Sequence, residues 1–294
     1  WAPSTSSAMR LLLLLLCLST PVIFSYKILV MNPQFAHSHC NFMGRMADIL
    51  VEAGHNVSSL MALMDPDVKP GTYKSNRIFM PRDPVAEEMF NMIKSVHADY
   101  FEMSIFNPIG VFMIGRAFGA VTSAQCRSNV RQKELIEKLR EEHFDVIITE
   151  NFDLCGMGLT HLIKPKSVIM TSTSSLFGEQ HDEIGVPQSL SFNPAEYSSH
   201  LDVHSFWSRL KNLYAGYLFR YFFSHIRSEA LKVFREEVSP DFPSFVELTS
   251  RSAYAFTNSE PLIDFAYPTL SRVINIGGLG AKAPAPLDEH WLEV

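Results

Sequence analysis

Short, continuous apolar runs alternate with longer helical patterns along most of this chain of 294 residues. An apolar run bounded by polar residues is typical of a strand that is buried on both faces. The expected strands are YKILVM (26–31), NVSSLMAL (56–63), RIFMP (77–81), FDVIIT (144–149), KSVIMT (166–171), SAYAFTNS (252–259) and RVINIGG (272–278). Repeated β–α–β units predict an α/β, Rossmann-like fold, in which a parallel sheet carries helices on both faces.

The segments between these strands supply the expected helices. Residues 41–53 place Phe42, Met46, Ile49 and Leu50 on one helical stripe that ends at Gly54. Helices are also expected over most of 84–142, over 154–163 and over 204–237. Residues 172–203 are rich in Ser, Pro, Asn and His, and we expect a long surface loop there.

Residues 1–25 have the layout of a secretory signal peptide, with Met9 as the expected natural start. Arg10 precedes an apolar run over 11–18, and smaller residues lead to a cleavage point near Ser25. A membrane anchor is the alternative, but the run is shorter than the roughly 20 residues of a span. We expect no later segment to span a membrane, because Arg220 interrupts the nearest one, at 212–223.

Charge and cysteine content narrow the class of protein further. The net charge is −6 and no basic run is present, which argues against a nucleic-acid partner. After the predicted signal region, Cys40, Cys126 and Cys155 remain. This small, odd number predicts no disulfide scaffold, although one bridge can form in an oxidising lumen.

Ionisable residues follow two of the predicted strands. The first strand leads into a loop with His37 and His39, and FDVIIT ends at Glu150, before Asn151 and Asp153. Ligands bind outside the carboxyl ends of parallel strands, so neighbouring strands would bring an imidazole and a carboxylate into one crevice. The carboxylate would orient the ring, whose other nitrogen could take a proton from a hydroxyl. The alternative for such a histidine is a surface or hydrogen-bonded role.

Other kinds of site have weaker support. His37, His39 and Cys40 could ligate a metal, but zinc sites need three or four ligands and no second cluster stands out. We therefore predict neither a metal nor a bound cofactor. The chain lacks a G-x-G-x-x-G after the first strand, a P-loop and a G-x-S-x-G elbow. The sequon Asn56-Val-Ser could carry a glycan, and its use stays open.

Two motifs resemble a known family, the animal UDP-glycosyltransferases, and especially the UDP-glucuronosyltransferases of nematodes. Ser38-His39 stands sixteen residues before the His of Gly54-His55, which is similar to the family's spacing. In FDVIITENFDLC, Glu150 occupies the family's acidic position, where mammalian members usually have Asp, and Cys155 follows five residues later.

The resemblance covers nearly the whole chain from Tyr26 to Trp291. Near its end, NSEPLIDFAYPTLSRVINIGGL and PLDEHW resemble the exit from the family's first domain. The resemblance implies the N-terminal, acceptor-binding domain of a GT-B glycosyltransferase over 26–280 and the start of an interdomain linker over 281–294. The donor domain is then expected to be absent from this sequence.

The resemblance also implies an inverting transfer reaction and the residues that would perform it. His39 would deprotonate a hydroxyl of a lipophilic small-molecule acceptor, which attacks a UDP-sugar, with glucuronate or glucose as the sugar. Glu150 would orient His39, with Asp153 as the alternative. Phe35 and Phe152 flank these positions and are expected to line the acceptor pocket.

The UDP-sugar would be bound by the missing domain, so this chain alone is expected to be inactive. The expected location is the lumen of the endoplasmic reticulum, with a membrane-anchored full-length form that acts in detoxification. An alternative is a truncated, non-catalytic binding or regulatory protein of that lumen, and a third is an unrelated hydrolase or metalloprotein using His37 and His39. The acceptor, the sugar, homo-oligomer formation and the choice between fragment and natural truncation stay open.

Overall fold

The computed structural model describes residues 25–95, 104, 106–176, 178–196, 198, 202–281, 286, 287 and 291. The expected signal region, except Ser25, and most of the expected linker lie outside the described residues. The strands are β1 (Lys27–Gln34), β2 (Asn56–Leu63), β3 (Asn76–Met80), β4 (Val146–Glu150), β5 (Ser167–Ser172), β6 (Tyr254–Thr257) and β7 (Val273–Asn275). The helices are α2 (His37–Glu52), α3 (Pro84–Ser95), α5 (Pro108–Val130), α6 (Lys133–Glu141), α7 (Leu154–Ile163), α8 (Gly178–Ile184), α9 (Phe206–Glu237) and α10 (Phe245–Ser250).

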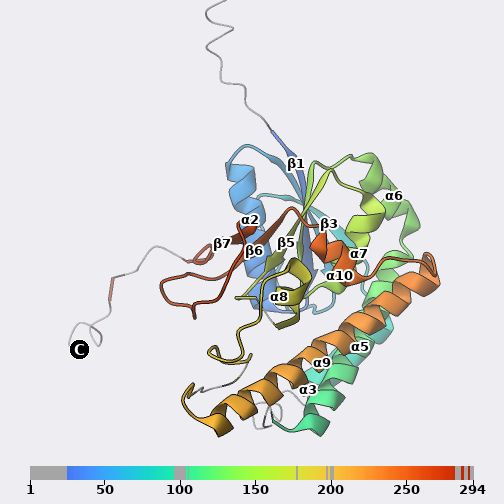
Figure 1. The fold of residues 1–294 in the computed structure, drawn as a ribbon. Helices are drawn as coiled ribbons and strands as arrows, with labels where there is room; N and C mark the ends of the chain where they lie inside the picture. The colour runs from blue at the N-terminus through green and yellow to red at the C-terminus, as the bar shows by residue number, and fades with distance from the viewer. Residues whose placement is uncertain are drawn as a thin grey trace, which may run out of the picture.

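The described strands form one sheet in the order β3-β2-β1-β4-β5-β6-β7 (Figure 1). Every neighbouring pair is parallel. The order reverses direction between β1 and β4, which makes the carboxyl ends of these two strands the topological switch point where ligands bind in such sheets. All seven predicted strands are present, and the predicted fold class is confirmed.

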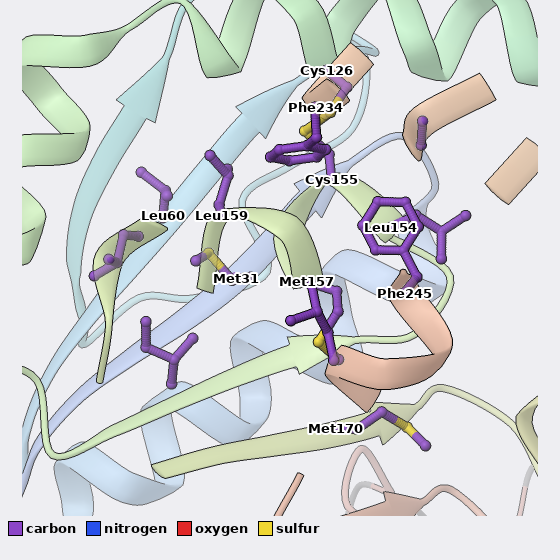
Figure 2. Packing of buried hydrophobic residues seen from close by; sticks show 14 of the residues in the cluster. Met31, Leu60, Cys126, Leu154, Cys155, Met157, Leu159, Met170, Phe234 and Phe245 are labelled. Atoms are coloured by element: carbon purple, nitrogen blue, oxygen red, sulfur yellow. A yellow bond between two sulfur atoms is a disulfide. The ribbon is translucent and has the colours of Figure 1, made fainter. Parts of the chain in front are cut away.

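Side chains of alternate residues in β1 point to opposite faces of the sheet. Ile28 and Val30 belong to a core cluster with Phe42 and Met43 of α2. Leu29 and Met31 belong to a second cluster, on the other face, built largely from α7, α9 and α10 (Figure 2). Because both faces are covered, the strands consist of continuous apolar runs rather than alternating ones.

The first helix begins earlier than expected, at His37 rather than at residue 41. The two histidines therefore lie in the first helical turn and not in a free loop. Gly44 permits this position, because a Cβ there would lie 2.1 Å from the carbonyl carbon of Gly71. Gly71 has φ +71°, a conformation that favours glycine. The close approach of two backbones fixes how α2 enters from β1.

The predicted surface loop over 172–203 is wrong in its first part. Residues 178–184 form α8, whose side chains Glu179, Gln180, His181 and Glu183 are buried. Helix α10 was also not predicted. In α8, Glu179 and Glu183 are buried because Arg227 of α9 pairs with both, which a sequence pattern does not show. Helix α10 has only six residues, too few for a helical period to stand out.

Helices α5 and α9 lie side by side along one edge of the molecule (Figure 1). Among the described helices, α5 is long and apolar enough to cross a membrane by length and composition alone, so the expectation that no segment would be is wrong. In this fold α5 packs closely on α9: a Cβ at Gly115 would lie 3.1 Å from the Phe222 ring, and one at Gly119 would lie 3.5 Å from the His225 ring. Part of its apolar surface, including Val111, Val121 and Val130, is buried in the fold, while Ile109 and Met113 are exposed.

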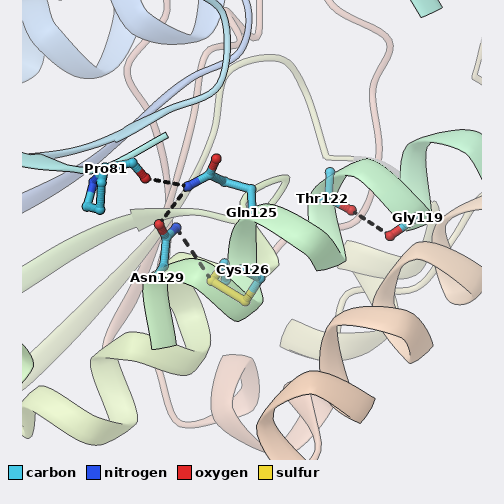
Figure 3. Close-up of a disulfide and its surroundings, with 7 residues drawn as sticks. Pro81, Gly119, Thr122, Gln125, Cys126 and Asn129 are labelled. Carbon is cyan, nitrogen blue, oxygen red and sulfur yellow. Dashed lines mark hydrogen bonds between the residues drawn. A yellow bond between two sulfur atoms is a disulfide. The ribbon is translucent and has the colours of Figure 1, made fainter. Parts of the chain in front are cut away.

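A disulfide links Cys126 of α5 to Cys155 of α7, and the third described cysteine, Cys40, is buried and free. The Cα atoms of the bridge are 5.4 Å apart, within the usual range. Beside the bridge, the Gln125 side chain donates to the Pro81 carbonyl at 3.0 Å and to Asn129 at 2.9 Å (Figure 3). Helix α5 is thereby attached both to α7 and to the end of β3.

Candidate active site

The switch point of the sheet brings His39 and Glu150 into contact. Glu150 is the last residue of β4, His39 lies in the first turn of α2, and β1 pairs directly with β4. The His39 Nδ1 atom lies 2.5 Å from Glu150 Oε1. With the carboxylate accepting this hydrogen bond, Nδ1 carries the hydrogen and Nε2 keeps its lone pair.

The two partners differ in exposure. The Glu150 side chain is 1% exposed, whereas the His39 side chain is 17% exposed. The carboxylate is therefore fixed within the protein, and the imidazole still reaches its surface. This is the arrangement that an orienting carboxylate and a general base require.

Thr173, which the sequence analysis missed, completes this contact. Its hydroxyl donates to Glu150 Oε1 at 2.8 Å and lies 3.2 Å from His39 Nδ1. Thr173 directly follows β5, the neighbour of β4. A polar residue just past the carboxyl end of the adjacent strand was the signal that could have identified it.

Two aromatic side chains enclose the imidazole. The Phe35 and Phe152 rings are stacked with centroids 5.3 Å apart, and the His39 ring lies 4.4 Å from Phe35 and 5.3 Å from Phe152. The hydrogen bond to Glu150 is thus shielded from water on this side, which strengthens it.

Phe35 and Phe152 also lie in the wall of a mostly apolar cavity of about 40 Å³. The rest of the wall includes Phe118 and Thr122 of α5, Ile226 of α9, and the Cys126–Cys155 bridge. The two aromatic rings therefore separate the imidazole from an apolar space between the sheet and helices α5 and α9.

Asp153, the alternative carboxylate, takes a different position. It lies in the cavity wall, with Gly156 packed against it, and no hydrogen bond joins it to His39 within the described residues. Loss of hydration raises the pKa of Asp153 to about 7, and the neighbouring Glu150 charge adds to this shift. Of the two predicted carboxylates, the geometry favours Glu150 as the partner of His39.

The other proposed metal ligands are not brought together with His39. His37 is exposed, and Cys40 is buried with its thiol donating to the Pro33 carbonyl at 3.1 Å. Burial raises the pKa of the Cys40 thiol to about 12, so it stays protonated at neutral pH. In the part of the chain that the structure describes, no group of three or more His, Cys, Asp or Glu side chains could hold a metal ion.

A buried ionic cluster lies beside the site, and the sequence analysis did not predict it. Arg227 of α9 pairs with Glu179 at 2.7 Å and with Glu183 at 2.5 Å, both on α8. Asn151, next to Glu150, donates to Glu183 at 3.2 Å. Burial raises the pKa of Glu179 to about 7 and also raises that of Glu183. This cluster connects the loop after β4 to α8 and α9.

Comparison with family models gives one match, described as "UDP-glucoronosyl and UDP-glucosyl transferase", which covers residues 26–293. A Caenorhabditis elegans protein named as a UDP-glucuronosyltransferase (ugt-48) is 32% identical over 92% of this chain and 52% of its own length. Human UDP-glucuronosyltransferase 3A1 is 30% identical over 95% of this chain and 53% of its own length. The chain thus spans about half the length of the curated relatives it matches.

Comparison with solved structures finds glycosyltransferases. The glycosyltransferase of kitacinnamycin aligns over 86% of this chain and 51% of its own, with 12% identity and a TM-score of 0.45. CalG4, the calicheamicin glycosyltransferase, aligns over 86% of this chain and 53% of its own, with 10% identity and a TM-score of 0.44.

Proposed function

The chain belongs to the UDP-glucoronosyl and UDP-glucosyl transferase family, and from this we propose that it is the acceptor-binding half of an inverting UDP-glycosyltransferase. One observation carries the proposal: the contact of His39 with the buried Glu150 at the switch point of the sheet. A transferase that uses a hydroxyl nucleophile needs such an oriented base, because a neutral hydroxyl is a poor nucleophile.

In the proposed reaction, Nε2 of His39 accepts the proton of an acceptor hydroxyl. The acceptor oxygen forms a bond to the anomeric carbon of the UDP-sugar, and the bond from that carbon to the UDP oxygen breaks. UDP leaves with the electron pair, and the configuration at the anomeric carbon inverts. Glu150 stabilises the imidazolium that forms on His39, and Thr173 holds the Glu150 oxygen in place.

For the acceptor we propose a lipophilic small molecule that carries a hydroxyl group. The support is the apolar wall that Phe35 and Phe152 form next to His39. At about 40 Å³ the cavity is much smaller than the ~300–1,000 Å³ of typical ligand pockets. Binding would therefore require the helices α5 and α9 to separate from the aromatic pair.

Binding of the sugar donor is not explained by the residues described above. We propose that a second domain binds the UDP-sugar, with glucuronate or glucose as the sugar, and that the protein works in the lumen of the endoplasmic reticulum. The alternative of a non-catalytic, acceptor-sequestering protein of that lumen makes a different prediction, because it needs the cavity but not the base.

The test uses a chimera in which this chain replaces the matching half of the nematode relative ugt-48. Transfer from UDP-glucuronate and from UDP-glucose to a panel of phenols and sterols is measured for the chimera and for two variants. His39→Ala should reduce kcat by about 10²–10⁴, without weakening UDP-sugar binding.

The matched control is His37→Ala, which removes an exposed imidazole two residues away in the same helical turn. It should leave kcat nearly unchanged. Equal activity of the two variants would contradict the role of His39. A chimera that binds acceptors but transfers no sugar from either donor would favour the sequestering alternative.

A further inference from the structure

A second cavity, which we name the polar cavity, lies between the segment around α8 and the chain that follows β6. Its volume is about 100 Å³, which is room for several water-sized groups. Its wall is formed by parts of 175–196 and of 264–267. In the part of the chain that the structure describes, it shares no lining residue with the cavity beside Phe35 and Phe152. The proposed reaction therefore leaves the polar cavity without a role.

Three polar atoms in the wall of this cavity are buried and have no hydrogen-bond partner in the protein. They are Nδ1 of His181, Oε2 of Glu196 and the hydroxyl oxygen of Tyr267. His181 lies in α8 and is 7% exposed, Glu196 follows α8, and Tyr267 follows β6. Buried polar groups in folded proteins nearly always have a partner. Three such atoms at one cavity indicate that a polar ligand binds there.

Hydrogen bonds outside the cavity fix the shape of its wall. The Asn212 side chain of α9 is buried and accepts from the Ala195 backbone N–H at 2.6 Å. It donates to the carbonyls of Leu190 at 2.8 Å and Asn193 at 2.9 Å. The Asn193 side chain donates in turn to the Ala266 carbonyl at 2.9 Å, which joins the two sides of the cavity.

The three unpartnered atoms can all accept a hydrogen bond. The His181 ring donates to the Leu176 carbonyl, and because Nδ1 has no partner, Nε2 carries this hydrogen and Nδ1 keeps its lone pair. Burial lowers the pKa of His181, which keeps the ring neutral. Glu196 accepts from the Gly178 backbone N–H at 2.5 Å through Oε1, which leaves Oε2 for a ligand. The Tyr267 oxygen is the third acceptor.

The wall of the polar cavity is also negatively charged. Its described part contains Glu196 and Asp264 but no Lys or Arg. Arg220 donates to Gln188 of the wall at 3.2 Å, but it also pairs with Asp182, which balances its charge. Burial raises the pKa of Glu196, because this carboxyl group has no ion-pair partner of its own. A positively charged ligand would supply that partner.

We propose that the polar cavity binds a small aliphatic amine in its protonated form. A primary ammonium group has three N–H donors and no acceptor, which matches the three acceptors of the wall. The rings of Phe265 and Tyr267 also line the cavity, and aromatic rings attract cations. A metal ion fits less well, because no group of three or more His, Cys, Asp or Glu side chains in the described residues could hold one.

The test measures binding of n-propylamine to the whole chain at pH 7 by ligand-observed NMR. At this pH the amine is protonated, and 1-propanol is the uncharged molecule of the same shape. We expect a dissociation constant of about 0.1–10 mM for the amine, because four non-hydrogen atoms limit the affinity. Propanol should bind roughly tenfold or more weakly.

The variant Glu196→Gln keeps an oxygen for the Gly178 N–H and removes the charge, so it should weaken amine binding by about tenfold or more. Tyr267→Phe removes one acceptor and should weaken binding by about threefold to tenfold. The matched control is Glu134→Gln, which removes an exposed carboxylate from the first turn of α6. It should leave the affinity unchanged.

Equal binding of propylamine and 1-propanol would overturn the proposal and would assign the cavity to neutral polar molecules. Binding of neither would also overturn it and would leave water as the occupant. If Glu196→Gln lowers the melting temperature, Asp264→Asn in the exposed part of the wall replaces it, and unchanged amine affinity in that variant would contradict the role of charge. These measurements involve no sugar transfer, so their outcome is independent of the His39 test.

Discussion

Charged residues lie at both ends of the strands, but their environments differ. At the amino ends of the strands, Asp145 accepts from Lys166 at 2.7 Å, and Lys166 is 74% exposed. At the carboxyl ends, Glu150 contacts His39 and is 1% exposed. Asp145 and Glu150 are separated only by the length of β4. The same strand thus joins a solvated ion pair at one end to a buried hydrogen-bonded carboxylate at the other.

This difference has a simple physical origin. A charge in water is already well solvated, so an exposed pair contributes little, whereas a buried charge depends on each partner that it has. The Lys166 hydrogen bond lowers the pKa of Asp145, while burial raises those of Asp153 and Glu179 to about 7. Carboxyl groups whose burial costs stability thus lie near the carboxyl ends of the strands, where we place the chemistry.

The largest expected effect is on stability, in the buried cluster beside the site. Arg227→Met removes the shared partner of Glu179 and Glu183. We expect a loss of about 3 kcal/mol in the free energy of unfolding, measured by urea denaturation at pH 7. This is at the low end for a broken buried pair, because Glu179, with its raised pKa, can take up a proton. A loss as small as that from an exposed pair would show that the cluster is solvated.

The next effect is on catalysis and compares the two ends of β4. In the chimera with the ugt-48 half, Glu150→Gln should reduce kcat by about 10–10², because the amide orients His39 less well and does not stabilise its charge. Asp145→Asn at the other end should leave kcat unchanged. If Asp153→Asn causes the loss instead of Glu150→Gln, the orienting carboxylate has been assigned to the wrong residue.

A smaller effect is expected in the pH dependence of stability. The contributions of Asp153, at the carboxyl ends of the strands, and of Asp145, at the amino ends, should change with pH in opposite directions. Between about pH 4 and 7, folded Asp153 holds a proton that the unfolded chain has lost, so its contribution to stability falls as the pH rises. Asp153→Asn should flatten the stability profile over this range and should be most favourable at pH 7.

Asp145 is the control for that profile. Its lowered pKa gives a contribution that is present above its unperturbed value of 3.8 and is lost as the pH falls through the lower, folded value. Asp145→Asn should therefore differ from the unchanged chain at neutral pH and converge with it in acid. If the stability of the Asp145 and Asp153 variants changed with pH in the same way, the contrast between the two ends of the strands would be refuted.

The smallest expected effect is that of Lys166→Met. Its partner Asp145 also accepts a hydrogen bond from the Lys27 backbone N–H at 2.8 Å, so it keeps a partner after the substitution. We expect a change in the urea midpoint within the error of the measurement. A midpoint shift as large as that of Arg227→Met would mean that the exposed Lys166–Asp145 pair contributes to stability as much as the buried Arg227 cluster does.

Apolar runs and motif spacings are local properties of the chain, so the seven strands, the α/β class and the family could be predicted without a structure. It also identified His39 and Glu150 as candidates, but their contact depended on the strand order that makes β1 and β4 neighbours. Phe35 and Phe152 lie close in sequence to these residues, and the fold stacks their rings together.

Which polar residues are buried, and with which partners, depends on how separate elements pack together. Polar residue types such as these usually lie on the surface. Thr173, Arg227 and the glutamates of α8 are instead paired with residues of other elements, which only the packing brings close. The pairing of Cys126 with Cys155 is of the same kind, since three cysteines leave the choice open until α5 and α7 are packed. A buried polar group is stable only with its partner, and the partner lies far away in the sequence.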